Sequence, residues 1–120
     1  KFGQVYLVGD VAKGTVRAFH RHNELVDWFF VSHGAAKFVF VDGRHDSPTY
    51  KHYQIVVSGD RKPVCITVPP GVWHGWMALT DDTQLISVAS VSHDPSKLDE
   101  ERLEPGYFNY MKNFWTIDFK

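Results

Sequence analysis

The stretch GTVRAFHRHNELVDWFFVSHG, residues 14–34, contains two runs of β-branched and aromatic residues and is bounded by glycines. Runs of this kind form β-strands. Side chains two apart along a strand point to the same face of its sheet, so His20 and His22 are expected to converge. Asp27 lies near the start of the second run and adds a carboxylate on the neighbouring strand.

The second informative stretch is PPGVWH, residues 69–74, in which a Pro-Gly turn precedes His74. Imidazole nitrogens and a carboxylate oxygen together make a ligand set that suits Zn, Fe, Mn, Ni or Cu. In the alternative interpretation, hydrogen bonds hold these histidines inside a barrel and no ion binds. The spacing predicts a divalent metal site made of His20, His22, Asp27 and His74.

Strand alternation also predicts which side chains share a face of the sheet, both for Arg17 and His20 and for Asp27. Arg17 is three residues from His20, so the two face opposite sides of an ideal strand. Both reach one pocket only if a β-bulge or twist intervenes, or if Arg17 lies at the rim. With Asp27 facing inward, the residues expected on its side are Phe29, Val31 and His33, and those expected to point away are Trp28 and Phe30.

Similar short runs, separated by Gly, Pro, Asp and Asn, continue along the chain. This spacing indicates an all-β protein, an antiparallel sandwich or barrel whose closure removes exposed edges. One short C-terminal helix is expected at Ser96–Leu103, with Asp94 as its N-cap and Pro95 at its start. The expected strands are Gln4–Val8, Thr15–His20, Val26–Ser32, Lys37–Asp42, Tyr53–Val57, Val64–Val68, Gly75–Leu79 and Leu85–Val91.

Composition indicates one domain over residues 1–120, because 43% of the 120 residues are hydrophobic and can form a core. The net charge is −1 and Lys and Arg are scattered, which argues against a nucleic-acid or anionic-membrane surface.

Cys65 is the single cysteine, so an internal disulfide is excluded and a cytoplasmic location is expected. We expect Cys65 to be a small core residue, and the aromatic tail from Tyr107 to Phe119 to pack on the barrel or on a second subunit.

The stretches Gly14–Gly34 and Pro69–His74 resemble the two motifs of the cupin superfamily. The resemblance implies a single cupin domain, a double-stranded β-helix or jelly-roll barrel. Metal-binding cupins use two histidines and a glutamate from the first motif and one histidine from the second. These positions fall on His20, His22, Asp27 and His74, where Asp27 is one methylene shorter than the usual glutamate.

Within that superfamily the chain is similar to the dTDP-4-dehydrorhamnose 3,5-epimerase family. The similarity covers about Gln4 to Leu103, and we expect that the N-terminal segment of full-length members is lacking. It implies a nucleotide-sugar substrate, and we also expect a homodimer. Four stretches carry it: KGTVRAFH (13–20), DGRHDSPTY (42–50), VPPGVWHGWMAL (68–79) and SHDPSKLDEER (92–102).

In that family a histidine in an RxxH segment takes the proton next to the sugar ketone, a lysine stabilises the enolate and a tyrosine returns the proton. The resemblance places Asp27 at the lysine position and Ser87 at the tyrosine position. A negative Asp27 would repel an enolate, whereas a bound divalent ion would restore the missing positive charge. The catalytic candidates are His20 and Arg17, and the substrate-binding candidates are Arg17, Gln4, Tyr50 and Trp76.

We therefore expect an isomerase that acts, with the help of a metal ion, on a nucleotide-linked keto-deoxysugar. The identity of the base is open, because a metal-bound His20 could not also abstract a proton. Without a metal, His20 is again the candidate base. Two alternatives remain: a metal-dependent cupin oxygenase acting on a small acid or thiol, and a non-catalytic ligand-binding cupin.

Overall fold

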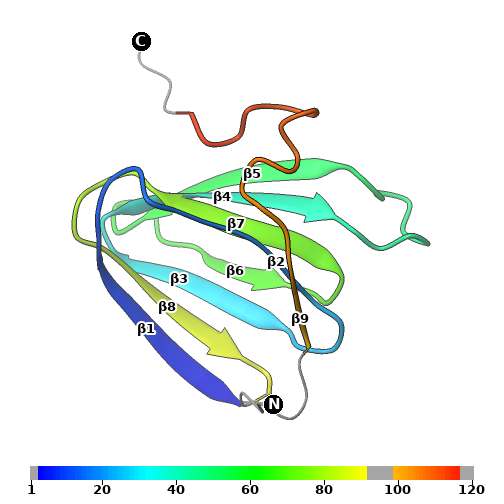
Figure 1. Ribbon diagram of the computed structural model, residues 1–120. Helices are drawn as coiled ribbons and strands as arrows, with labels where there is room; N and C mark the ends of the chain where they lie inside the picture. The colour runs from blue at the N-terminus through cyan, green and yellow to red at the C-terminus, as the bar shows by residue number, and fades with distance from the viewer. Residues whose placement is uncertain (1–2, 92–98, 117–120) are drawn as a thin grey trace.

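The protein is described here by a computed structural model that covers residues 3–91 and 99–116, and these residues form two antiparallel sheets that face each other (Figure 1). The strands are β1 (Gln4–Val11), β2 (Val16–His22), β3 (Asp27–His33), β4 (Ala35–Asp42), β5 (Tyr53–Gly59), β6 (Cys65–Val68), β7 (Val72–Ala78), β8 (Thr83–Ala89) and β9 (Glu100–Arg102).

The chain passes back and forth between the two sheets. One sheet has the order β1-β8-β3-β6 and the other the order β5-β4-β7-β2-β9. Neighbouring strands are therefore mostly distant in sequence, as in a jelly roll with Greek-key connections. The predicted all-β jelly roll is confirmed, and the eight expected strands are found with small shifts at their ends.

The core lies between the sheets, and β3 shows how the sequence builds it. Asp27, Phe29 and Val31 are buried, whereas Phe30 points outward and is exposed. The predicted alternation is confirmed as far as Val31. Beyond it the pairing with β8 shifts register, and His33 at the end of the strand is exposed.

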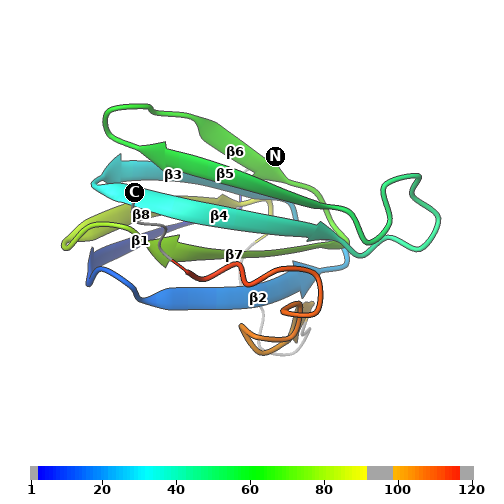
Figure 2. The same cartoon turned by 90° about the horizontal axis from the view of Figure 1, so that it is seen from above.

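The C-terminal segment covers the outer face of the five-stranded sheet (Figure 2). Phe108 and Phe114 are buried there against Phe19, Val39 and Trp73. The edge of one ring meets the face of the next in the Phe19–Phe108 pair, whose centroids are 4.9 Å apart. The prediction that the aromatic tail packs on the barrel is confirmed for Phe108 and Phe114, whereas Tyr107 and Tyr110 are exposed.

Two expectations are wrong. The described end of the expected helix, Glu100–Arg102, is the strand β9, because it pairs with β2 instead of closing a helical turn on itself; residues 92–98 of that region lie outside the described residues. Cys65 is exposed rather than part of the core, because it pairs with Phe30 of β3, which points outward, and shares its face of the sheet. Within the described ranges, no helix has the length and apolarity that a membrane crossing requires.

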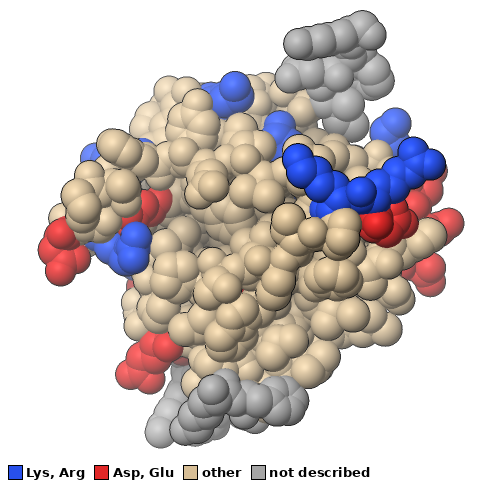
Figure 3. All heavy atoms as spheres, turned by 180° about the vertical axis from the view of Figure 1, so that it is seen from behind, with Lys and Arg blue, Asp and Glu red and all other residues tan. Residues whose placement is uncertain are grey.

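Charge is scattered on the face seen in Figure 3, where Lys and Arg lie at the margins with Asp and Glu beside them. The broad centre of this face carries uncharged side chains. Such a distribution offers no continuous basic surface on this side of the molecule.

Asp42 organises the loop that contains the stretch DGRHDSPTY. Its buried carboxylate accepts hydrogen bonds from the guanidinium of Arg44 at 2.9 and 3.0 Å and from the hydroxyl of Ser47 at 2.7 Å. The Arg44 hydrogen bonds are the main cause that holds the pKa of Asp42 far below its ordinary range, with burial acting in the opposite direction.

Replacing Asp42 with Asn should lower the free energy of unfolding by about 2 kcal/mol at pH 7, because charged hydrogen bonds are lost. A carboxylate with a depressed folded pKa stabilises the fold above its unfolded pKa of about 3.8, and this stabilisation is lost as the pH falls through the folded value. Urea unfolding at pH 7 and pH 3 tests this. The difference between wild type and D42N should shrink at pH 3, and an undiminished difference would contradict the ionic origin.

Candidate functional site

A large open pocket lies between the two sheets and contains most of the residues that the sequence singled out. Its volume is about 1380 Å³, more than the roughly 300–1,000 Å³ of a site for a drug-sized ligand. Histidines of β2 and β7 line one wall, and residues of β1, β3 and β8 line the other. The functional candidates in its lining are Arg17, His20, His22, Asp27, His74, Trp76 and Ser87.

His22, Asp27 and His74 converge on one point. The Nε2 atom of His22 lies 3.2 Å from Oδ2 of Asp27, and Nε2 of His74 lies 3.5 Å from the same oxygen. One ligand atom from each residue lies within 4.8 Å of the other two. In a tetrahedral site with bonds of about 2.1 Å, ligand atoms are about 3.4 Å apart. The two distances to Oδ2 are close to this value, and hydrogen bonds from the two rings to the carboxylate have the same length.

The ring of His74 is also held through its second nitrogen. Its Nδ1 lies 3.1 Å from the carbonyl oxygen of Val72, so Nδ1–H donates to that oxygen and Nε2 faces the carboxylate of Asp27. A lone pair that faces a carboxylate oxygen is repelled unless a cation or a proton lies between them. Metal-ligating histidines are held in this way through their second nitrogen.

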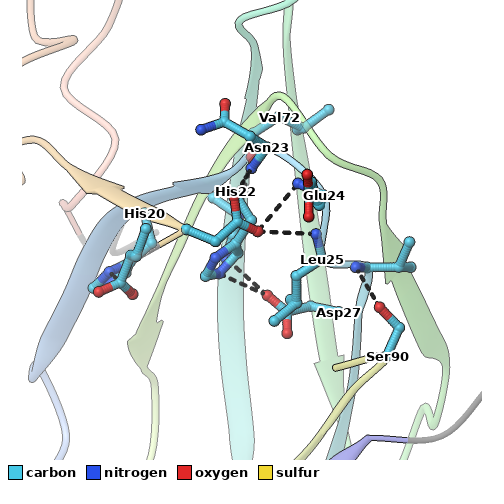
Figure 4. A network of polar contacts seen from close by, with 12 residues as sticks. His20, His22, Asn23, Glu24, Leu25, Asp27, Val72 and Ser90 are labelled. Atoms are coloured by element: carbon cyan, nitrogen blue, oxygen red, sulfur yellow. Dashed lines mark hydrogen bonds and ion pairs between the residues drawn. The ribbon is translucent and has the colours of Figure 1, made fainter. Parts of the chain in front are cut away.

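Asp99 holds the loop between β2 and β3, whose residues Asn23, Glu24 and Leu25 are labelled in Figure 4. Its carboxylate accepts hydrogen bonds from the backbone N–H groups of Asn23, Glu24 and Leu25 at 2.9–3.1 Å. Burial would raise the pKa of Asp99, but these three hydrogen bonds lower it. One further bond, from the N–H of Val26 to the Ser90 hydroxyl at 3.0 Å, fixes the last loop residue before β3.

The charges within this group are coupled. Burial alone would raise the pKa of Asp27, but hydrogen bonds from His22 and His74 outweigh it and lower the pKa to about 2. Burial would lower the pKa of His22, but the Asp27 carboxylate raises it above its ordinary value. Asp27 is therefore a carboxylate at every physiological pH and attracts a cation to this point.

His20 lies apart from these three side chains, as Figure 4 shows. Its Nδ1 is 3.0 Å from Oε1 of Glu100 on β9, an ion-pair contact in which the N–H is not aligned well enough for a hydrogen bond. Burial lowers the pKa of His20 below its ordinary value, and Glu100 opposes part of that shift. The ring also lines the pocket.

A β-bulge brings Arg17 and His20 to one pocket. The pairing of β2 with β7 shifts register between them, which confirms the predicted irregularity. Gly75 permits close contact of the two strands here, because a Cβ at this position would collide with the side chain of Ala18.

Not all of the predicted site residues meet in the pocket. Trp76 is buried in the core and also lines the pocket. Gln4 lies on β1 beside the pocket but is not part of its lining. Tyr50 lies in the loop after β4, where its ring contacts His45 at a centroid distance of 4.7 Å. The substrate-binding roles of these three residues stay predictions.

Sequence reasoning missed Glu100, Asp99 and Tyr6, which line the same pocket. Glu100 and Asp99 belong to the stretch SKLDEERL, which was expected to form a helix. Their carboxylates could have been suspected as partners of the histidines only if the pairing of β9 with β2 had been known. Tyr6 carried no signal in the sequence beyond its place in a strand.

Comparison with known proteins gives a consistent result. The sequence model of the dTDP-4-dehydrorhamnose 3,5-epimerase family matches residues 1–104. The chain is 32% identical over 91 residues to the spore coat polysaccharide biosynthesis protein SpsL of Bacillus subtilis, and this covers 75% of the chain and 60% of SpsL. It is 36% identical over 92 residues to the Haloferax volcanii protein named "Probable low-salt glycan biosynthesis epimerase Agl13", with coverage of 75% and 59%. The chain thus spans about 60% of the length of these curated relatives.

Solved structures agree with the sequence comparison. The crystal structure of a dTDP sugar isomerase from Desulfovibrio desulfuricans G20 superimposes with a TM-score of 0.82 at 27% sequence identity. The match covers 96% of this chain and 72% of that protein. The two-sheet architecture of this chain is therefore shared with a solved dTDP sugar isomerase.

Proposed function

The chain belongs to the dTDP-4-dehydrorhamnose 3,5-epimerase family, and from this premise we propose that it is an isomerase that inverts a carbon next to the ketone of a nucleotide-linked keto-deoxysugar. The observation that carries the proposal is His20, a pocket-lining histidine held beside the carboxylate of Glu100. A neutral imidazole next to a carboxylate is suited to take up a proton, because the carboxylate stabilises the imidazolium that forms.

The open pocket also suits a substrate with several parts. Arg17 is exposed at the pocket, and a guanidinium binds a diphosphate through two parallel hydrogen bonds. The keto-sugar would then lie deeper, between His20 and Asp27. A homodimer is part of this proposal, because Val5 and Leu7 are exposed on the edge strand β1. So is a cytoplasmic location, with which the single cysteine is compatible.

We further propose that a divalent metal ion is held by His22, Asp27 and His74, whose donor atoms have the spacing described above. When bound, the ion supplies a positive charge that polarises the ketone oxygen, the role of the lysine for which Asp27 stands here. His20 lies outside this group, so the same histidine is not required as both ligand and base.

The reaction is tested by hydrogen exchange in D₂O with a dTDP-linked 4-keto-6-deoxyhexose. We expect deuterium to enter at one carbon next to the ketone rather than at two, because a single base, His20, serves one face. The chain should thus be a poor 3,5-epimerase. Absence of exchange with metal present would overturn the proposal in favour of a ligand-binding protein or an oxygenase.

The oxygenase is the second candidate, because two histidines and one carboxylate are the ligand set of non-haem iron oxygenases. Iron in the purified protein, together with oxygen consumption in the presence of a small acid or thiol, would favour it. An isomerase consumes no oxygen, so the measurement separates the two functions.

Replacing Glu100 with Gln should shift the acid limb of the kcat/KM profile to lower pH. In the wild type this limb reports His20 and should lie below pH 6.5, because burial lowers its pKa; Glu100 raises that pKa, so its loss lowers it further. Glu101→Gln is the matched control, since the neighbouring Glu101 pairs with Arg21 instead. If the limb does not move in E100Q, Glu100 does not act through His20.

A further inference from the structure

Ser87 stands at the position where the resemblance places the proton-returning tyrosine, yet the structure brings another tyrosine beside it. In the register of β1 with β8, Tyr6 is the direct partner of Ser87. Directly opposed residues of an antiparallel pair project from the same face, with Cβ atoms about 4.5–5.5 Å apart. Tyr6 therefore projects from the same face of the sheet as Ser87.

This face is the one that lines the pocket. Ser87 is buried and is also opposite Phe29 of β3, whose side chain is in the core. Tyr6 and Ser87 both belong to the pocket lining, together with His20 across the gap between the sheets. Tyr6 is 44% exposed, so its ring lies at the mouth of the pocket, where it has access to water.

We propose that Tyr6 is the proton donor of the reaction and replaces, from the adjacent strand, the tyrosine that Ser87 lacks. This inference rests on the proposed isomerase function and names a further catalytic residue for it. His20 on one sheet and Tyr6 on the other face the pocket from opposite walls, which is the arrangement that inversion at a carbon requires.

The proton transfers balance. His20 takes the proton from the carbon next to the ketone and becomes an imidazolium, while the C–H electron pair forms the enolate. The Tyr6 hydroxyl then gives its proton to the other face of the same carbon, the ketone is restored, and a phenolate remains. Water at the pocket mouth carries a proton from the imidazolium to the phenolate and resets both groups.

The test is Tyr6→Phe, assayed in D₂O for the rate of inversion and for the rate of deuterium exchange with retained configuration. Without a donor, inversion should fall by roughly 10²–10⁴-fold, whereas exchange with retained configuration should continue, because His20 is intact. A merely structural role would lower both rates together. Tyr53→Phe is the matched control, because Tyr53 is 45% exposed on β5 and packs on Phe114, away from the pocket.

A swap of the two partners, Tyr6→Ser with Ser87→Tyr, sharpens the test. The composition of the protein is unchanged and the hydroxyl moves one strand over, to the position used in the family. Recovery of inversion to within about tenfold of wild type supports the assignment. Inversion at the wild-type rate in Y6F overturns the assignment of Tyr6 and leaves the proposed isomerase function intact. If the wild-type protein shows no exchange, the proposed function itself is overturned.

Discussion

Replacing His20 with Asn is expected to slow deuterium exchange next to the ketone by roughly 10²–10⁴-fold, the usual contribution of a general base. The effect should be large because His20 is the pocket histidine that faces a carboxylate without belonging to the His22–Asp27–His74 group. The measurement is exchange followed by NMR with a dTDP-linked 4-keto-6-deoxyhexose. Binding of the nucleotide sugar should change little, since Asn preserves a polar side chain at the pocket wall.

His33→Asn is the control for this variant. His33 lies 3.8 Å from Asp60 and is exposed, so it repeats a histidine–carboxylate contact outside the pocket. Its replacement should leave exchange at the wild-type rate. Exchange that persists undiminished in H20N would show that another group is the base, and His22 would then be the next residue to replace.

The barrel could be predicted because strand alternation is local. The inward order of Asp27, Phe29 and Val31 follows from a period of two, and turn residues mark where each strand ends. The spacing of His20, His22 and Asp27 placed all three at one pocket for the same reason.

The separation of His20 from the His22–Asp27–His74 group could not be predicted in this way. The bulge between Arg17 and His20 depends on the pairing of β2 with β7, and the partner of His20 comes from β9, far along the chain. Glu100 was expected in a helix, because the local pattern of charges does not reveal a strand that forms only by pairing with β2. Long-range strand pairing thus decides which histidine lies beside Glu100 and outside the His22–Asp27–His74 group.

Asp27→Asn is expected to weaken binding of a divalent ion by more than the roughly 10–100-fold that follows loss of an outer-shell partner, because a direct ligand loses its charge. The full chain, treated with a chelator and then titrated with Zn²⁺ by calorimetry, should bind one ion per chain at His22, Asp27 and His74. The ion should also raise Tm, since ligand at about 100 times its Kd stabilises the fold by about 2.7 kcal/mol.

Asp27→Glu should retain the ion, because a longer carboxylate is the usual cupin ligand at this position and can reach the two histidines. Thermal unfolding of the ion-free variants shows whether Asp27→Asn has only damaged the fold; in that case His22→Gln, at a less buried position, makes the same test. Equal Zn²⁺ affinity in wild type, D27N and H22Q would overturn the site. If Zn²⁺ binds as expected but ion-free protein exchanges the substrate proton at the full rate, the ion is structural and the charge that stabilises the enolate must come from Arg17.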